Sequence, residues 1–276
     1  MTVTTLQAAA RPRSYVSVNG QDAASYLNRM VSNEVEELDI GASCEALLLT
    51  PKARIVAPLV VLRRAQDDFL LLTEPEAGAR LARELLRARF AAKCAIEAEE
   101  HRSVVVLGAA EEDFVSSLNE LALPNRDYGV PAVELLDADA PEEAEPIGEH
   151  ELERLRIIAR TPRLGRELDD RVMPAEAGLE ERTISFTKGC YPGQEPVARL
   201  HYRGHPNRGL RVLAMEGTDL PAYDAELALD GKAVGRVTSA APDPEHGVVA
   251  LAYVRREVPA EATLDLSGRR ITQLGA

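Results

Sequence analysis

The stretch KGCYPGQEPVAR, residues 188–199, sets a cysteine among turn-forming residues just before a short helical segment. Two glycines and a proline surround Cys190 and predict a turn, and residues 193–202 are typical of a short helix. The thiol would face the positive end of the helix dipole, and Lys188 adds a full positive charge two residues away. Both effects stabilise a thiolate, so the pattern predicts that Cys190 is a working thiol activated by Lys188.

The other two cysteines have apolar neighbours. Cys44 stands beside residues 47–49 and Cys94 stands between Ala92 and Ile96, which predicts two small buried hydrophobes. Three cysteines, odd in number and widely spaced, argue against a disulfide framework and against a CxxC zinc module. We therefore expect any functional cysteine of this chain to act singly.

Acidic and basic residues are unevenly distributed along the 276 residues of the chain. There are 32 Lys and Arg against 45 Asp and Glu, a formal charge of −13, yet the stretch 154–211 holds twelve basic and seven acidic residues. This stretch carries +5, which leaves −18 for the remainder. One interpretation is a set of solvated charged faces. The other is an anion-binding surface in an otherwise acidic protein.

Composition excludes several classes of protein. With seven Tyr, four Phe and no Trp, aromatic platforms for single-stranded nucleic acid are scarce, and we expect no direct nucleic-acid partner. The longest uncharged apolar run, residues 55–62, is far shorter than the roughly 20 residues of a spanning helix. The first ten residues lack the charged and apolar regions of a secretory signal. The sequence thus predicts a cytoplasmic protein with no membrane partner.

Common catalytic and metal-binding motifs are missing from the sequence. It contains no GxGxxG, GxxxxGK[ST], GxSxG or HExxH pattern. His201 and His205 have the spacing of a helical metal pair, but Gly204 and Pro206 disfavour a helix across them. We therefore predict no metal site.

Strand and helix patterns mix in the first half of the chain. Strands are predicted at 14–18, 45–49, 55–62 and 69–73, and helices at 21–30 and 75–89. A strand–glycine–helix unit recurs about 90 residues apart, at Gly20 and Gly108, with Phe114 and Val115 in the second helix. Adjacent strands with interspersed helices predict an α+β fold rather than a doubly wound sheet.

The second half changes character after Gly204. An acidic loop at 137–148 precedes a predicted helix at 149–159 and an ordered system of turns. Short strands are then predicted at 210–215, 226–229, 233–237, 248–254 and 262–266, with an Asp-Gly hairpin signal at 230–231. We predict two parts, residues 1–205 with two α+β lobes and residues 206–276 as a small β-barrel or sandwich.

The sequence resembles a known family in several places. Residues 188–199 resemble the signature of YgfZ-type folate-binding proteins, K-G-C-[FY]-x-G-Q-E followed by Arg, with every fixed position present. Residues 18–23 and 48–54 resemble the N-terminal motifs of that family, residues 173–179 its P-x-E segment, and residues 235–239 its terminal barrel. The resemblance implies the three-lobed α+β fold of the glycine-cleavage T-protein, an aminomethyltransferase, with a C-terminal β-barrel. It also implies a folate-binding region around tetrahydrofolate in a central opening.

The resemblance further implies a role in assembling or maintaining iron–sulfur clusters, including those of radical enzymes that modify tRNA. Iron–sulfur enzymes or assembly proteins are then the expected partners beside folate. Because a cluster needs about four ligands, one thiol allows only a transient or shared contact with it. Around Cys190 and Lys188, the residues expected to bind the cofactor are Gly189, Tyr191, Gly193, Gln194, Glu195, Arg199 and Arg208.

Two departures separate the chain from the T-proteins. Arg80 stands near the position of their catalytic Asp, and a cation cannot do the same proton chemistry. Ile158 stands where their R-x-E-x-G motif carries the Glu that holds the pterin ring. We therefore expect a folate-binding protein that is not an ordinary aminomethyltransferase. The alternatives are a tetrahydrofolate-dependent aminomethyltransferase of the glycine-cleavage type and a purely structural motif in which Gln194 and Glu195 cap backbone amides.

Overall fold

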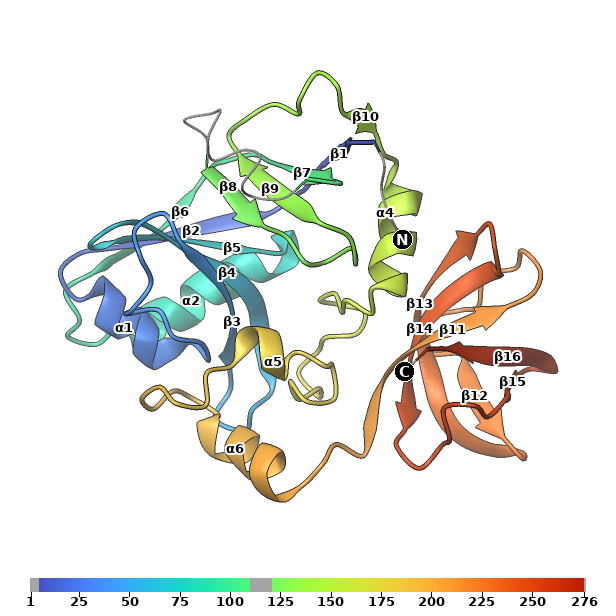
Figure 1. Cartoon of the computed structure of the whole chain (residues 1–276). Coiled ribbons are helices and arrows are strands. Elements are labelled where there is room, and N and C mark those ends of the chain that lie inside the picture. Colours follow the sequence, from blue (N-terminus) through green and yellow to red (C-terminus); the bar gives the residue numbers. More distant parts are fainter. Residues whose placement is uncertain (1–4, 110–120, 276) are drawn as a thin grey trace.

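Three lobes surround a central junction in the computed structural model, which describes residues 5–109 and 121–275 (Figure 1). Two lobes are built on five-stranded sheets and the third is a closed barrel. The predicted α+β fold with a C-terminal barrel is confirmed. Phe114 and Val115, the helix residues of the second strand–glycine–helix unit, lie outside the described residues.

The first lobe is an antiparallel sheet with the strand order β3-β4-β5-β2-β6. Its strands are β2 (Ser14–Asn19), β3 (Ser43–Leu49), β4 (Ile55–Ala65), β5 (Asp68–Thr73) and β6 (Ala95–Glu99). On one face, α1 (Ala23–Met30) and α2 (Gly78–Ala88) bury Leu27 and Leu81 against alternate strand residues. The predicted helix at 75–89 therefore exists, with a 3₁₀ turn, η1 (Pro75–Ala77), as its first part.

The second lobe has the strand order β10-β1-β7-β9-β8. Its strands are β1 (Gln7–Ala10), β7 (Ser103–Leu107), β8 (Leu121–Pro124), β9 (Ala132–Leu136) and the two-residue β10 (Glu145–Pro146), which pairs with β1 inside the predicted acidic loop. Leu123 and Leu136 pack on the face of the first sheet that α1 and α2 leave open, against Leu62 and Leu70. The first sheet is thus covered on both faces.

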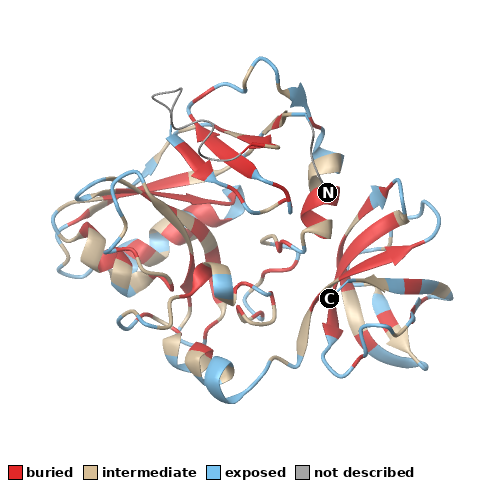
Figure 2. Ribbon diagram, viewed as in Figure 1, coloured by how far each residue is buried: buried red, intermediate tan, exposed pale blue. Residues whose placement is uncertain are grey.

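The third lobe closes into a barrel with the order β11-β14-β13-β12-β15-β16. Its strands are β11 (Arg208–Met215), β12 (Glu226–Leu229), β13 (Lys232–Asp243), β14 (Gly247–Arg255), β15 (Leu264–Leu266) and β16 (Arg269–Leu274). Asp230 and Gly231 both have positive φ and join β12 to β13, which confirms the predicted hairpin. Figure 2 shows buried residues along β13 and β14, where α4 (Glu149–Ile158) packs.

The segment between α4 and the barrel runs from the centre of the molecule to its lower edge in Figure 1, and it holds α5 (Glu180–Thr183) and α6 (Gln194–Arg203). Buried Glu167 links it to the barrel, because its carboxylate accepts hydrogen bonds from Arg156 (3.1 Å) and from Ser239 of β13 (2.7 Å). Since α6 ends at Arg203, His201 and His205 do not share a helix. Among the described residues, none of the helices has the length and apolarity that crossing a membrane demands.

Candidate functional site

The motif at 188–199 is docked on the turn that joins β3 to β4. Gly193 has φ +85°, and a Cβ placed on it would stand 2.6 Å from the carbonyl oxygen of Thr50 and 3.0 Å from the Cα of Ala53. Only glycine allows both that backbone conformation and that approach. Tyr191 adds its ring to a buried cluster that includes Ile55 of β4 and Tyr253 of β14. The motif therefore joins the first lobe to the barrel.

Lys188 and Cys190 diverge in the folded chain. The Lys188 ammonium donates hydrogen bonds to the carbonyl oxygens of Val31, at 3.0 Å, and of Asn33. Burial lowers the pKa of this amine to about 8. Cys190 is exposed. The lysine thus fixes the base of the loop while the thiol faces solvent.

The other predicted site residues spread over α6 and the start of the barrel. Gly189, Glu195 and Arg199 are exposed, Gln194 is half-buried, and no side chain of the described residues caps α6 at Gly193. Arg208 donates from Nε to Glu176 (2.9 Å), and its guanidinium lies over the ring of Tyr253, 4.7 Å from the centroid. Arg208 is therefore already paired within the protein.

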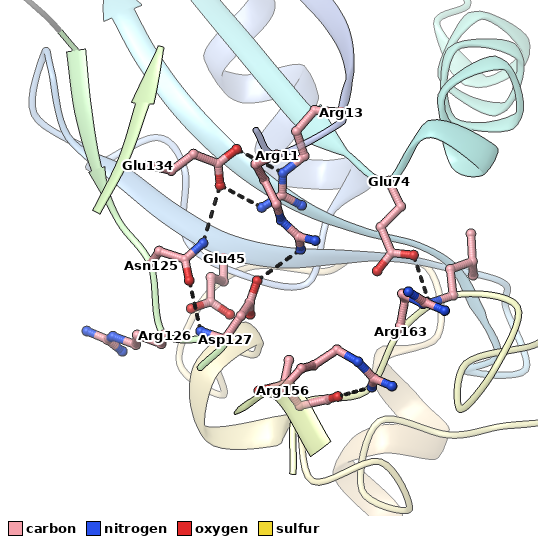
Figure 3. A network of polar contacts seen from close by, with 12 residues as sticks. Arg11, Arg13, Glu45, Glu74, Asn125, Arg126, Asp127, Glu134, Arg156 and Arg163 are labelled. Carbon is pink, nitrogen blue, oxygen red and sulfur yellow. Dashed lines mark hydrogen bonds and ion pairs between the residues drawn. The ribbon is translucent and has the colours of Figure 1, made fainter. Parts of the chain in front are cut away.

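A polar cavity lies where the two sheet lobes meet the segment after α4 (Figure 3). We call it the arginine-lined cavity, because its charged lining consists of Arg11, Arg13, Arg126, Arg156, Arg163 and Arg182 together with Glu45, Glu74, Asp127 and Glu134. The cations outnumber the carboxylates by two. Among the described residues, the lining includes neither the motif at 188–199 nor Arg208.

One side of the cavity is formed by a series of linked ion pairs and hydrogen bonds (Figure 3). Arg13 holds Glu134 with two bonds, Nε–Oε1 at 3.0 Å and Nη2–Oε2 at 2.8 Å, and Asn125 bridges Glu134 to the backbone of Asp127. Arg182 contacts both Asp127 (3.1 Å) and Glu45 (2.8 Å). Burial acts to raise the pKa of the Glu134 carboxyl, but the charge and hydrogen bonds of Arg13, together with the charge of Arg11, outweigh it and hold the pKa below its ordinary value.

Glu74 differs from the other carboxylates of the lining. It follows β5 directly, is buried, and accepts through Oε2 a hydrogen bond from the backbone N–H of Leu164 (2.9 Å). Burial raises its pKa to about 7, although the charges of Arg11, Arg13 and Arg163 act in the opposite direction. This carboxyl can therefore be neutral or ionised near neutral pH.

Two further polar atoms of the lining are buried without a partner. Within the described part of the chain, neither Nε of Arg11 nor Oγ1 of Thr161 has a hydrogen-bond partner. Buried polar atoms are ordinarily paired, and an unpaired one in a cavity is explained by a ligand or a water. Arg156 and Arg163 pair with Glu153, and Arg156 also pairs with Glu167, whereas Arg126 has no ion pair among the described residues. The cavity therefore suits a polar ligand that carries negative charge at one end.

The basic stretch 154–211 supplies Arg156, Arg163 and Arg182, but sequence reasoning did not find the rest of the lining. Arg11 and Arg13 lie between β1 and β2, and Glu74 follows a buried strand, which is a signal that could have singled it out. Arg80 and Ile158, the two departures from the T-proteins, lie on α2 and at the end of α4. Ile158 packs on the cluster between α4 and the barrel.

Comparisons with known proteins agree with this architecture. The family model for the GCVT N-terminal domain matches residues 12–129. A "tRNA-modifying protein YgfZ" from Edwardsiella ictaluri is 27% identical over 296 residues, covering 94% of this chain and 87% of the relative. An aminomethyltransferase from Streptomyces avermitilis is 25% identical, covering 87% of this chain and 75% of the relative.

A solved structure shares the fold. The glycine cleavage system aminomethyltransferase T from Bartonella henselae superposes with a TM-score of 0.82 at 19% identity, covering 99% of this chain and 86% of that chain. The predicted resemblance is confirmed by the family model, by the named relatives and by this fold. The chain is therefore similar to the YgfZ/GcvT-like family, over residues 12–129 by the family model and over most of its length by the named relatives.

Proposed function

We propose that this chain binds tetrahydrofolate or a derivative in the arginine-lined cavity and supports iron–sulfur enzymes that modify tRNA. The observation that carries the folate site is the cavity itself, with Arg126 outside any ion pair among the described residues and with unpaired polar atoms on Arg11 and Thr161. The relative named tRNA-modifying protein YgfZ supports the cellular role. Folate supplies one-carbon chemistry when bound; the residues of the lining hold and orient it.

The donor set of the cavity fits the two ends of a folate. The polar ring needs hydrogen-bond partners, which the unpaired polar atoms offer, and the tail carries carboxylates that arginine binds well. Arg126 is exposed on the lining, and among the described residues no carboxylate forms an ion pair with its side chain. We assign the tail to Arg126. Arg199 and Arg208, which the sequence analysis expected to bind the cofactor, would contact only a portion that reaches beyond the lining.

Calorimetric titration with tetrahydrofolate tests the folate site. We expect the native chain to bind and Arg126→Gln to bind about tenfold more weakly, because one charge-assisted contact is lost. Arg87→Gln is the matched control, since Arg87 is an exposed arginine on α2. No binding by the native chain, or equal binding by both variants, would contradict this site.

Cys190 is the proposed working thiol for the contact with iron–sulfur enzymes or assembly proteins. Its side chain is exposed, and the loop is fixed on both sides by the bonds of Lys188 and the close packing of Gly193. Such a loop presents the sulfur at a constant position. Because one thiol cannot hold a cluster, the partner supplies the other ligands.

Complementation of a strain that lacks this protein tests the thiol. Cys190→Ala should fold normally yet fail to restore tRNA modification by radical enzymes, whereas Cys44→Ala, altered at a partly buried cysteine, should restore it. Thermal unfolding of both variants provides the check on folding. Full rescue by Cys190→Ala would remove the thiol from the mechanism.

The aminomethyltransferase alternative is favoured by the Bartonella fold and the Streptomyces relative. It requires that the chain form methylenetetrahydrofolate from an aminomethyl-lipoyl carrier. Arg80 and Ile158 argue against it, since neither can supply a carboxylate. An assay of that product with purified chain and carrier decides between the two functions.

A further inference from the structure

One carboxylate of the arginine-lined cavity has no cation of its own. Three carboxylates of the lining are each bonded to a guanidinium group: Glu134 to Arg13, Asp127 to Arg11 and Arg182, and Glu45 to Arg182. Glu74 forms no such pair among the described residues, and its one hydrogen bond there comes from the backbone of Leu164. In Figure 3 its carboxylate stands apart from the group formed by Glu134, Asn125 and Asp127.

Keeping this group buried costs free energy. A buried carboxylate without a counter-ion is destabilised by the loss of hydration, and the raised pKa of Glu74 expresses that cost. An apolar residue at the same position would destabilise the folded state less. The bond from Leu164 engages only Oε2 and fixes the direction of the carboxylate, which leaves Oε1 with no protein donor among the described residues.

We propose that Glu74 accepts hydrogen bonds from the ligand of this cavity, at a heterocycle edge that carries an amino group beside a ring N–H. This inference rests on the proposed folate site and identifies the residue that orients the ring there. A carboxylate matches paired N–H donors, and Ile158, which packs toward the barrel, offers no acceptor. Glu74, which directly follows β5, thus supplies the hydrogen-bond acceptor that Ile158 at the end of α4 does not.

The charges of the cavity also fix which end of the ligand meets Glu74. An anionic tail beside Glu74 would be repelled, whereas a ring with N–H donors is attracted. Arg126 lies on a separate element, in the loop after β8, and receives the tail. The ligand is thereby oriented with its ring at Glu74 and its carboxylates at Arg126.

Three probes separate the two ends of the ligand: tetrahydrofolate, a tetrahydropterin without a tail, and 4-aminobenzoyl-glutamate as the tail alone. Glu74→Gln should weaken binding of the first two by about 10–100-fold and leave the third unchanged. The amide of Gln can still accept the bond from Leu164, so we expect the variant to fold. Glu76→Gln, on the exposed turn η1, is the matched control and should bind all three probes normally.

Different results identify which proposal fails. If the native chain binds tetrahydrofolate and Glu74→Gln binds it equally well, Glu74 is not the acceptor and the folate site stands. If the native chain binds neither tetrahydrofolate nor the tetrahydropterin, the folate site falls and this inference with it. Glu74→Asp keeps the negative charge but shortens the side chain by one methylene, so it should also bind tetrahydrofolate and the tetrahydropterin more weakly. If this variant bound both as tightly as the native chain, the inference would be overturned, even if Glu74→Gln did not fold.

Discussion

The motif at 188–199 and the arginine-lined cavity are built in opposite ways. The motif is continuous in sequence and is held by a buried tyrosine ring, a glycine pressed on a backbone turn and a lysine bonded to carbonyls. The cavity takes its side chains from segments far apart in sequence, and ion pairs such as Arg11–Asp127 join them. In the motif Lys188, Tyr191 and Gly193 stabilise the fold, while the Cys190 thiol is exposed. In the cavity most charges are paired and one carboxylate is left for a ligand.

Removal of a paired charge from the cavity should have the largest effect on stability. Arg13→Ala leaves Glu134 buried without its partner and should lower the free energy of unfolding by about 3–5 kcal/mol. The double variant Arg13→Met, Glu134→Leu removes both charges and should recover much of the loss. Urea unfolding measures both values. Equal stability of the single and double variants would mean that the pairing in this cavity carries little energy.

The glycine of the motif should give the next largest effect. Gly193→Ala adds a Cβ against the backbone of Thr50 and Ala53 in a left-handed conformation, which should cost about 2–4 kcal/mol. Gly189→Ala is the control in the same loop, because a Cβ there meets no atom within 4 Å. A similar loss in both variants, measured by urea unfolding, would show that the loop is not held by this contact.

The unpaired carboxylate should make stability depend on pH. The pKa of Glu74 rises from 4.5 to about 7 in the folded chain, so the folded state binds a proton more tightly than the unfolded state does. Native stability therefore falls as the pH rises from about 4.5 to 7. Glu74→Gln carries no such ionisable group, so its free energy of unfolding should be about 3 kcal/mol higher than that of the native chain at pH 8. The difference should vanish near pH 4. A difference that does not change with pH would contradict the raised pKa.

The smallest effect is expected at the thiol. Cys190 is exposed, so Cys190→Ser should change the free energy of unfolding by no more than about 0.5 kcal/mol. If the motif only braces the lobes through this residue, the loss should exceed 1 kcal/mol, while tRNA modification in cells stays normal. Measuring unfolding and complementation on this one variant thus distinguishes a functional, exposed thiol from a purely structural role of Cys190.

Much of the fold could be predicted because its signals are local. The apolar residues at 55–62 and 69–73 mark β4 and β5, and the Asp-Gly pair at 230–231 marks a hairpin of the barrel. Strand β16, rich in polar residues, carries no comparable pattern and was not predicted. Apolar strands of the second lobe, such as the buried β9, were also not predicted, so local patterns locate most strands of the first lobe and the barrel but few of the second lobe.

The site was less accessible to sequence reasoning. The two-residue spacing of Lys188 and Cys190 indicated an interacting pair, yet the ammonium binds carbonyls of residues 31 and 33. Glu74 and Leu164, which meet in the cavity, stand 90 positions apart, and no periodicity relates such positions. Which charges meet is decided by the packing of the lobes, and a single sequence does not encode that in any local pattern.

The contact between Gly193 and the turn at Thr50 has a consequence for the order of folding. A ribosome releases the β3–β4 hairpin long before it completes residues 188–199, and domains generally fold from the N-terminus during synthesis. The surface that receives Gly193 can therefore exist before the loop is made, while Tyr253 is added still later with β14. The loop that carries Cys190 thus gains its first support from the emerging first lobe and its later packing, through Tyr191, from β14 of the barrel. Ribosome-bound nascent chains of increasing length should show two successive drops in the rate at which this loop is proteolysed.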